Sequence, residues 1–97
     1  MAKGYWIAHL TINDPERFKQ YQAANAAPLS AHGARFLVRG GAFVDNSGTA
    51  RKRHVVVEFP SFAAAKACFE SAEYQAAYKI LKEAAEVDHL MLEGYEG

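Results

Sequence analysis

The chain is poor in cysteine, in net charge and in long apolar runs. Cys68 is its one cysteine among 97 residues, which excludes an intrachain disulfide and a cysteine-based zinc cluster. Lysine and arginine number 11, as do aspartate and glutamate, so nothing draws the chain electrostatically to nucleic acid or anionic membranes. No apolar run approaches the roughly 18 residues of a membrane-spanning helix, and no signal-peptide core is present. We therefore expect a cytoplasmic protein with neither nucleic acid nor membrane as a partner.

What the sequence does contain supports one packed domain. Hydrophobic residues make up 51% of the chain and charged residues 23%, a composition that forms a core rather than remaining disordered. A chain of 97 residues has room for one such core and not for two. We therefore expect residues 1–97 to form a single domain.

The pattern of apolar residues predicts four strands separated by helices and turns. Runs rich in aromatic and β-branched residues indicate strands over residues 5–12, 34–39, 54–59 and 89–93. A helix is expected to begin after Asp14-Pro15, a typical capping pair, and to end at Gly33. Pro28 falls inside this helix, where its missing amide hydrogen predicts a kink or a break.

A second helix is predicted to begin at Ser61 and to restart at Ser71, since either serine can cap a helical turn. The helix is therefore expected to be broken or bent at Ser71. Residues 45–48 carry the turn signal of a long hairpin between the second and third strands. The order of elements predicts a ferredoxin-like α+β sandwich (β-α-β-β-α-β), with a four-stranded antiparallel sheet and two helices on one face.

The predicted strands are apolar on both faces. Val55-Val56-Val57, Phe36-Leu37-Val38 and Leu90-Met91-Leu92 lack the alternation expected of a sheet with one face in water. Two helices cover only one face, and a copy of the same sheet is the simplest cover for the other. We therefore expect a homodimer in the form of a dimeric α/β barrel, which also protects the strand edges. The alternative is a monomer with an exposed apolar face.

Three strand residues are candidates for chemistry: His9, Arg39 and Glu58. Strand alternation does not say whether they share one face of the sheet. If they converge on one cavity, Arg39 would hold an acidic or carbonyl ligand while His9 and Glu58 carry protons. Otherwise Arg39 and Glu58 would form an internal salt bridge that fixes the strand register, or they would be charges at fraying strand ends near Gly40 and Pro60.

The predicted helices supply candidates for the wall of a ligand pocket. Tyr21 and Asn25 lie on the apolar stripe of the first helix, and Tyr74 lies on that of the second. Asn25 either lines the pocket or binds the carbonyl that Pro28 frees, and Tyr74 is either a core residue or a pocket wall. The four histidines lie far apart in the sequence and form no close helical ligand pair, so we expect no metal site and no cofactor.

Several of these residues belong to motifs that occur in a fixed order: Gly4-Tyr5-Trp6-Ile7-Ala8, Asp14-Pro15, Tyr21, Arg39-Gly40-Gly41, Glu58-Phe59-Pro60-Ser61 and Ser71-x-Glu73-Tyr74. In these motifs the chain resembles the domain-of-unknown-function family 1330 over nearly its whole length. The resemblance implies the dimeric α/β-barrel superfamily, whose members include antibiotic-biosynthesis monooxygenases, muconolactone isomerases and haem-degrading enzymes. It implies no activity, but it singles out five positions as functional: Tyr21, Arg39, Glu58, Ser71 and Tyr74.

Two functional hypotheses follow from the sequence. The first is a small-molecule-binding dimer with cofactor-independent, monooxygenase- or isomerase-like chemistry on a small acidic or phenolic metabolite. Arg39 would anchor an anionic oxygen, His9 or Glu58 would transfer protons, and the tyrosines would shape the walls. The second hypothesis is a non-catalytic binding or accessory dimer, in which the same polar groups serve only the fold.

Overall fold

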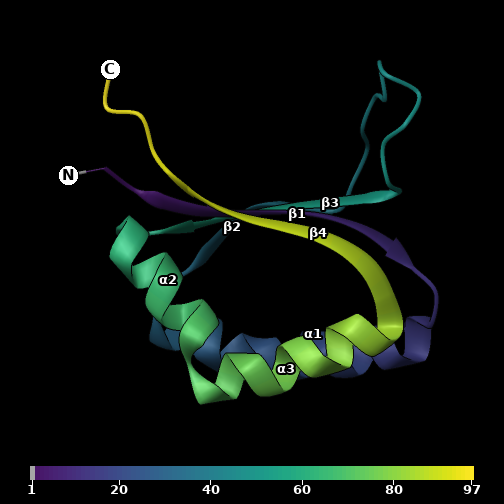
Figure 1. Ribbon diagram of the computed structural model, residues 1–97, viewed down its shortest axis with the longest axis horizontal. Helices are drawn as coiled ribbons and strands as arrows, with labels where there is room; N and C mark the ends of the chain where they lie inside the picture. Colours follow the sequence, from purple (N-terminus) through teal and green to yellow (C-terminus); the bar gives the residue numbers. More distant parts are fainter. Residues whose placement is uncertain (1) are drawn as a thin grey trace.

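The computed structural model, which describes residues 2–97, is a two-layer sandwich of one sheet and three helices (Figure 1). The sheet has the order β2-β3-β1-β4, and every neighbouring pair is antiparallel. All three helices cover the same face of the sheet (Figure 1). This arrangement confirms the ferredoxin-like α+β fold. Along the chain, the elements are β1 (Gly4–Ile12), α1 (Pro15–Ala31), β2 (Arg35–Arg39), β3 (Arg53–Phe59), α2 (Phe62–Glu70), α3 (Ala72–Ala84) and β4 (Ala85–Glu93).

Helix α1 begins as the sequence predicts but does not break at its proline. The Asp14 carboxylate accepts a hydrogen bond from the Arg17 amide at 3.1 Å and caps the first turn. The helix then continues through Pro28 to Ala31, so the expectation of a break was wrong. Pro28 and Leu29 are both buried, and packing of this turn against the core offsets the one helical hydrogen bond that a proline removes.

The predicted break at Ser71 is confirmed, and it divides the second helix into α2 and α3. Ser71 has extended backbone angles and ends one helix while beginning the next. Its hydroxyl donates to the Cys68 carbonyl at 2.7 Å and accepts from the Tyr74 amide at 3.2 Å. One side chain thus satisfies the end of α2 and the start of α3, and it directs α3 back across the sheet.

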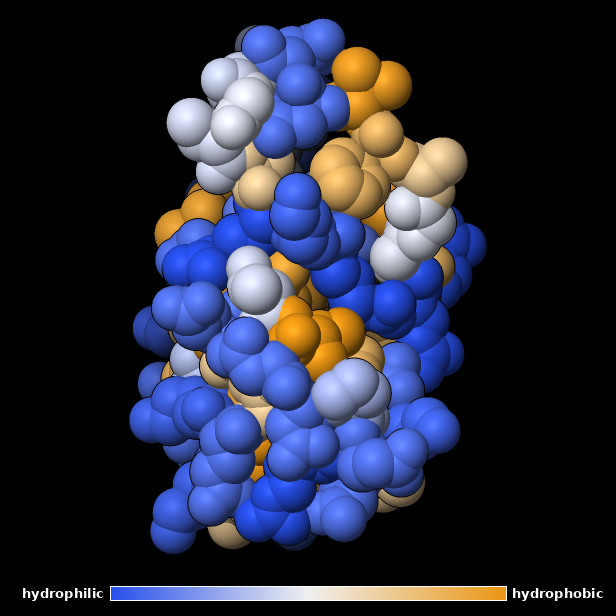
Figure 2. All heavy atoms as spheres, turned by 90° about the vertical axis from the view of Figure 1, so that its right-hand side faces the viewer, coloured by the Kyte–Doolittle hydropathy of each residue, from blue (hydrophilic) through white to orange (hydrophobic). Residues whose placement is uncertain are grey.

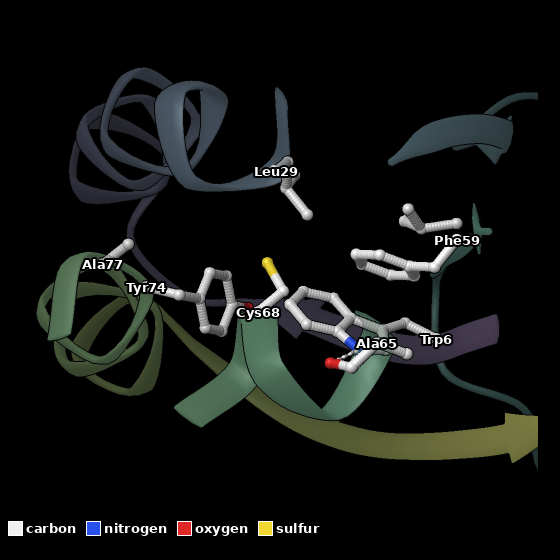
Figure 3. Close-up of a cluster of buried hydrophobic side chains, with 8 residues drawn as sticks. Trp6, Leu29, Phe59, Ala65, Cys68, Tyr74 and Ala77 are labelled. Atoms are coloured by element: carbon white, nitrogen blue, oxygen red, sulfur yellow. Dashed lines mark hydrogen bonds between the residues drawn. The ribbon is translucent and has the colours of Figure 1, made fainter. Parts of the chain in front are cut away.

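The core lies between the sheet and the helices and is centred on aromatic side chains. Trp6 of β1 packs against Phe59 and Tyr74, with ring centroids 4.9 and 4.7 Å apart. The Trp6 indole donates a hydrogen bond to the Ala65 carbonyl of α2 at 3.1 Å, drawn as a dashed line in Figure 3. Because this bond joins β1 to α2 inside the core, it fixes how the helix lies on the sheet.

Strand register divides the sheet residues into two sets. On the face that the helices cover, Trp6 pairs with Val57, and Leu10 pairs with Arg53. On the other face, which we call the open face, His9 pairs with His54. A β-bulge between Phe36 and Val38 interrupts the alternation in β2. The open face also carries Tyr5, Ile7, Val56 and Glu58 from β1 and β3.

The start of the last strand differs from the sequence prediction. Strand β4 begins at Ala85 rather than at residue 89, because α3 passes into it without a loop. The Ala84 carbonyl at this junction accepts hydrogen bonds from the amides of Asn13 and Asp14.

The long hairpin between β2 and β3 forms as the sequence predicts. Residues 40–52 are its loop, which projects beyond the open face (Figure 1). The predicted turn at Asp45 does form, since its carboxylate accepts hydrogen bonds from three amides within the loop.

None of the helices in residues 2–97 is both long enough and apolar enough to span a membrane.

Replacing Ser71 by alanine should destabilise the protein by about 1 kcal/mol, as loss of a helix N-cap typically does. The same substitution at Ser30, an exposed residue of α1, is the matched control and should change the free energy of unfolding by less than about 0.5 kcal/mol. Urea unfolding followed by circular dichroism measures both. Equal effects would show that Ser71 does not act as the cap.

Candidate functional site

A cavity of about 50 Å³ lies between α1 and the helix-covered face of the sheet. Its inner wall is apolar and aromatic, and its polar groups come from five different elements. This volume has room for a few water molecules, whereas an engineered cavity that binds benzene measures about 150 Å³. A ring-sized ligand therefore enters only if side chains at the mouth move. The polar residues that line the cavity are Tyr21, Gln22, Asn25, Arg39, Arg53, Tyr74 and His89.

Two tyrosine hydroxyls meet at the inner wall of the cavity. The hydroxyls of Tyr21 in α1 and Tyr74 in α3 are 2.8 Å apart. Burial raises the pKa of Tyr21, and hydrogen bonds from Tyr74 and Asn25 only partly oppose this. Burial also raises the pKa of Tyr74, whose side chain is fully buried. Both phenols therefore stay neutral at physiological pH and act as hydrogen-bond donors and acceptors.

His89 also lines the cavity, and it lies on β4, the strand at the other edge of the sheet from β2. Its position opposite Ala8 puts it on the helix-covered face. The imidazole stacks on Phe69 at 5.1 Å and meets the edge of Trp6 at 4.9 Å. Desolvation by these apolar neighbours lowers the pKa of His89 to about 4. The ring is therefore neutral at pH 7, and its buried Nε2 atom has no hydrogen-bond partner within residues 2–97.

Two arginines lie at the mouth of the cavity. Arg53 stands over the Phe18 ring, 5.4 Å from its centroid, and its buried Nε has no partner in the described part of the chain. Arg39 is exposed and lies over the Phe36 ring at 4.4 Å. Figure 2 faces the end of the molecule from which the long loop projects, and it shows hydrophobic side chains exposed between hydrophilic surfaces. Both guanidinium groups carry their charge next to apolar surface, where an anion is bound more strongly than in open water.

The structure brings together four of the residues that the sequence singled out. Tyr21, Asn25, Arg39 and Tyr74 all line this cavity. Asn25 is buried at 6% exposure beside Tyr21, which favours the pocket-lining alternative over a bond to a carbonyl freed by the proline. Ser71 does not line the cavity, because its hydroxyl is used at the junction of α2 and α3.

The convergence of His9, Arg39 and Glu58, which the sequence left conditional, does not occur. His9 and Glu58 lie on the open face, whereas Arg39 pairs with Val55 on the helix-covered face. The alternative of an Arg39–Glu58 salt bridge is also wrong. The cation beside the Glu58 carboxylate is that of Arg35, at 3.7 Å.

Sequence reasoning missed Arg53 and His89. Arg53 directly precedes the strand predicted over residues 54–59, and His89 is the first residue of the last predicted strand. The pairing of the strands shows which face of the sheet these two side chains occupy. Arg53 lies opposite the apolar Leu10, and His89 lies opposite Ala8. This information comes from the register of β1 with β3 and β4, and the sequence of a single strand does not contain it.

Comparison with known proteins identifies the family. The sequence pattern of the family described as "Domain of unknown function (DUF1330)" matches residues 3–95. The chain belongs to this family. The family description names no activity. No protein with a curated description matches the chain.

Solved structures similar to this family member share its fold at low sequence identity. A protein of unknown function from Rhodopseudomonas palustris is 14% identical, with a TM-score of 0.74 over 99% of this chain and 85% of that one. SnoaB, a cofactor-independent oxygenase from Streptomyces nogalater, is 13% identical, with a TM-score of 0.64 over 100% and 97% of the two chains. A dimeric ferredoxin-like protein of unknown function from Thermobifida fusca is 17% identical, with a TM-score of 0.55 over 95% and 89%. Likenesses this distant establish the fold alone.

The buried His89 should make the protein sensitive to acid. The unfolded chain takes up a proton on this histidine near pH 6.5, whereas the folded chain does so only near pH 4. The unfolded state therefore binds more protons in this window, and the free energy of unfolding falls as the pH drops from 6.5 to 4. In His89→Phe, which keeps an aromatic ring on Phe69, this fall should be shallower.

Urea unfolding at a series of pH values tests this expectation. The difference in free energy of unfolding between wild type and His89→Phe should be constant above pH 6.5, and below it the wild-type value should fall relative to that of His89→Phe. Parallel curves down to pH 4 would show that His89 titrates alike in the folded and unfolded chains.

Proposed function

We propose that this protein is a homodimer that binds a small acidic or phenolic compound in the cavity under α1 and acts on it without a cofactor. One observation carries the proposal: Arg53 Nε and His89 Nε2 are buried at the cavity without hydrogen-bond partners among residues 2–97. A buried polar group without a partner costs about 1–3 kcal/mol. A ligand that accepts a hydrogen bond from Arg53 Nε and forms a hydrogen bond with His89 Nε2 removes this cost.

The residues around the cavity suit a planar ligand with an ionisable oxygen. Arg53 would hold a carboxylate or phenolate oxygen in charge-assisted hydrogen bonds. Arg39 would join it when the Arg39 side chain moves at the mouth of the cavity. The tyrosine pair, Tyr21 and Tyr74, would bind a second oxygen at the inner end. The aromatic wall of Trp6 and its neighbours would pack on the ring of the ligand.

Proton removal is the chemical step that these groups support. His89 is neutral, so its Nε2 can accept a proton from a ligand hydroxyl or an acidic carbon. Because burial disfavours the imidazolium, this transfer depends on the ligand anion that forms beside the ring. The cation of Arg53 would stabilise the phenolate or enolate that results. Such an anion is the common first product of isomerisation and of direct reaction with dioxygen. His89 replaces His9 and Glu58 in this role, because those two side chains lie on the other face of the sheet.

The structural relatives support this reading. SnoaB has the same fold and is a cofactor-independent oxygenase, so the fold is compatible with cofactor-independent chemistry. Fold similarity at 13% identity does not carry over an activity by itself. The proposal for this chain therefore depends on the polar groups of its own cavity.

The open face of the sheet supports the dimer. By strand register, Val38, Leu90 and Leu92 lie on this face, and they are 42%, 52% and 41% exposed. The loop of residues 40–52 adds Phe43 and Val44, which are exposed beside it. An apolar surface of this kind on a small chain marks an interface. A second copy would cover both sheets at once, and the similar protein from Thermobifida fusca is described as dimeric.

Ligand binding should depend on the arginines of the cavity. Wild type should be stabilised in a thermal-shift screen by benzoate or salicylate, and less by neutral benzyl alcohol. Arg53→Met and Arg39→Ala should each weaken the affinity measured by calorimetry about tenfold or more, the value of one charge-assisted hydrogen bond. Arg35→Ala removes a guanidinium from the other face of β2 and is the matched control.

Two results would contradict the proposal. If no aromatic acid, phenol or enolisable acid shifts the melting temperature, or if Arg35→Ala weakens binding as much as Arg53→Met does, the cavity is not the site. The non-catalytic dimer would then remain as the function of the fold.

A charged residue introduced on the open face by substitution tests the dimer. Wild type should have twice the chain mass of 10.7 kDa in light scattering at micromolar concentration. Leu90→Lys should reduce the measured mass to that of one chain, because an unpaired ammonium in an apolar interface is costly. Ala67→Lys, on an exposed position of α2, should leave the dimer intact. A wild type that scatters as a single chain would rule out the homodimer.

A further inference from the structure

A pair of histidines lies on the open face, away from the cavity. His9 and His54 are directly opposite each other on β1 and β3. Their Nδ1 atoms are 2.8 Å apart, and the ring planes make an angle of 67°. The Phe43 ring of the long loop meets the edge of His54 at 4.5 Å and limits its rotation. Two paired strand positions therefore hold two ring nitrogens within 2.8 Å of each other.

Only two arrangements bring the ring nitrogens this close. Either one Nδ1–H donates to the other nitrogen, or both nitrogens are unprotonated and bind the same cation. Two imidazole nitrogens that bind one ion at about 2.0–2.1 Å and at a right angle are about 2.9 Å apart. The observed separation of 2.8 Å matches that geometry. A tetrahedral pair would be about 3.3 Å apart and would require the rings to separate.

The surroundings leave room for a hydrated ion. A hollow of about 220 Å³ is bounded by His9, His54 and the end of the long loop. The two charged residues in its wall, Arg51 and Asp88, bind each other at 2.8 Å. The guanidinium is therefore already paired with a carboxylate and does not compete for the histidine nitrogens. Within residues 2–97 no group of three or more candidate ligands gathers, so the remaining positions around an ion would be filled by water.

We propose that His9 and His54 chelate a divalent first-row transition-metal ion through their Nδ1 atoms. The right-angled geometry favours Ni²⁺ or Cu²⁺, which accept octahedral or square arrangements, over tetrahedral Zn²⁺. The ion ties β1 to β3 and binds only the folded chain, so it raises the stability of the protein. His54 Nε2 is buried without a partner in the described chain, and a site that lacks this outer hydrogen bond is of moderate affinity. The site does not rest on the proposed cavity function, because it lies on the other face of the sheet.

Calorimetric titration of the tag-free protein with NiCl₂, in a buffer that does not bind metals, tests the proposal. Wild type should bind one Ni²⁺ per chain, and binding should be lost in His54→Ala and in His9→Gln. His32→Ala is the matched control, because His32 binds the Pro28 carbonyl at the end of α1 and should leave the isotherm unchanged. Arg53→Met should also bind Ni²⁺ normally, which separates this site from the cavity.

A second measurement reports the ligands themselves. The electron paramagnetic resonance spectrum of the Cu²⁺ complex should show coupling to two imidazole nitrogens in wild type and to at most one in either variant. The proposal is overturned if wild type binds no metal, since the two rings then share only a hydrogen bond. It is also overturned if binding survives in a folded His9→Gln protein. Circular dichroism confirms the fold of each variant, and His9→Gln carries the test alone if His54→Ala fails to fold.

Discussion

The antiparallel pairing of β1 with β3 and β4 is the constraint on which the rest of the structure depends. Opposite residues in these pairs share a face, so the register alone decides which side chains meet under the helices. It places Arg53 and His89 beside the core and His9 and His54 on the open face. A shift of one residue would exchange the two sets and remove both the cavity and the apolar open face.

Contacts between the helices form the rest of the cavity wall. The break at Ser71 turns α3 so that Tyr74 comes within hydrogen-bonding distance of Tyr21 on α1. The bond from Trp6 to the Ala65 carbonyl holds α2 on the same face (Figure 3). The cavity is therefore lined by elements that are distant in sequence, and its polar groups are held by packing rather than by a flexible loop. Such preorganisation is what a binding site for a small rigid ligand requires.

The sequence predicted those parts of the fold that local patterns determine. The strands, the cap at Asp14 and the break at Ser71 each follow from a few neighbouring residues. The continuity of α1 through Pro28 did not, because burial of that turn in the core decides it. The wall residues Tyr21, Asn25 and Tyr74 were also found, since helical spacing puts them on apolar stripes.

The facing of the charged strand residues was not predictable in the same way. Arg35 and Arg39 are four positions apart, and simple alternation puts them on one face. The bulge between Phe36 and Val38 separates them, so that Arg35 meets Glu58 on the open face and Arg39 reaches the cavity. A bulge is a property of the paired strands, and a single strand sequence gives little sign of it.

The central claim is that the two faces of the sheet have separate uses, with small acidic or phenolic compounds bound only on the helix-covered face. Nuclear magnetic resonance during titration with salicylate tests this most directly, with side-chain signals as reporters. The account predicts the largest shifts at the Trp6 indole, the Asn25 amide and the His89 ring, with the His9 and His54 rings unchanged. Largest shifts at His9 and His54 would contradict it and would put the ligand on the open face.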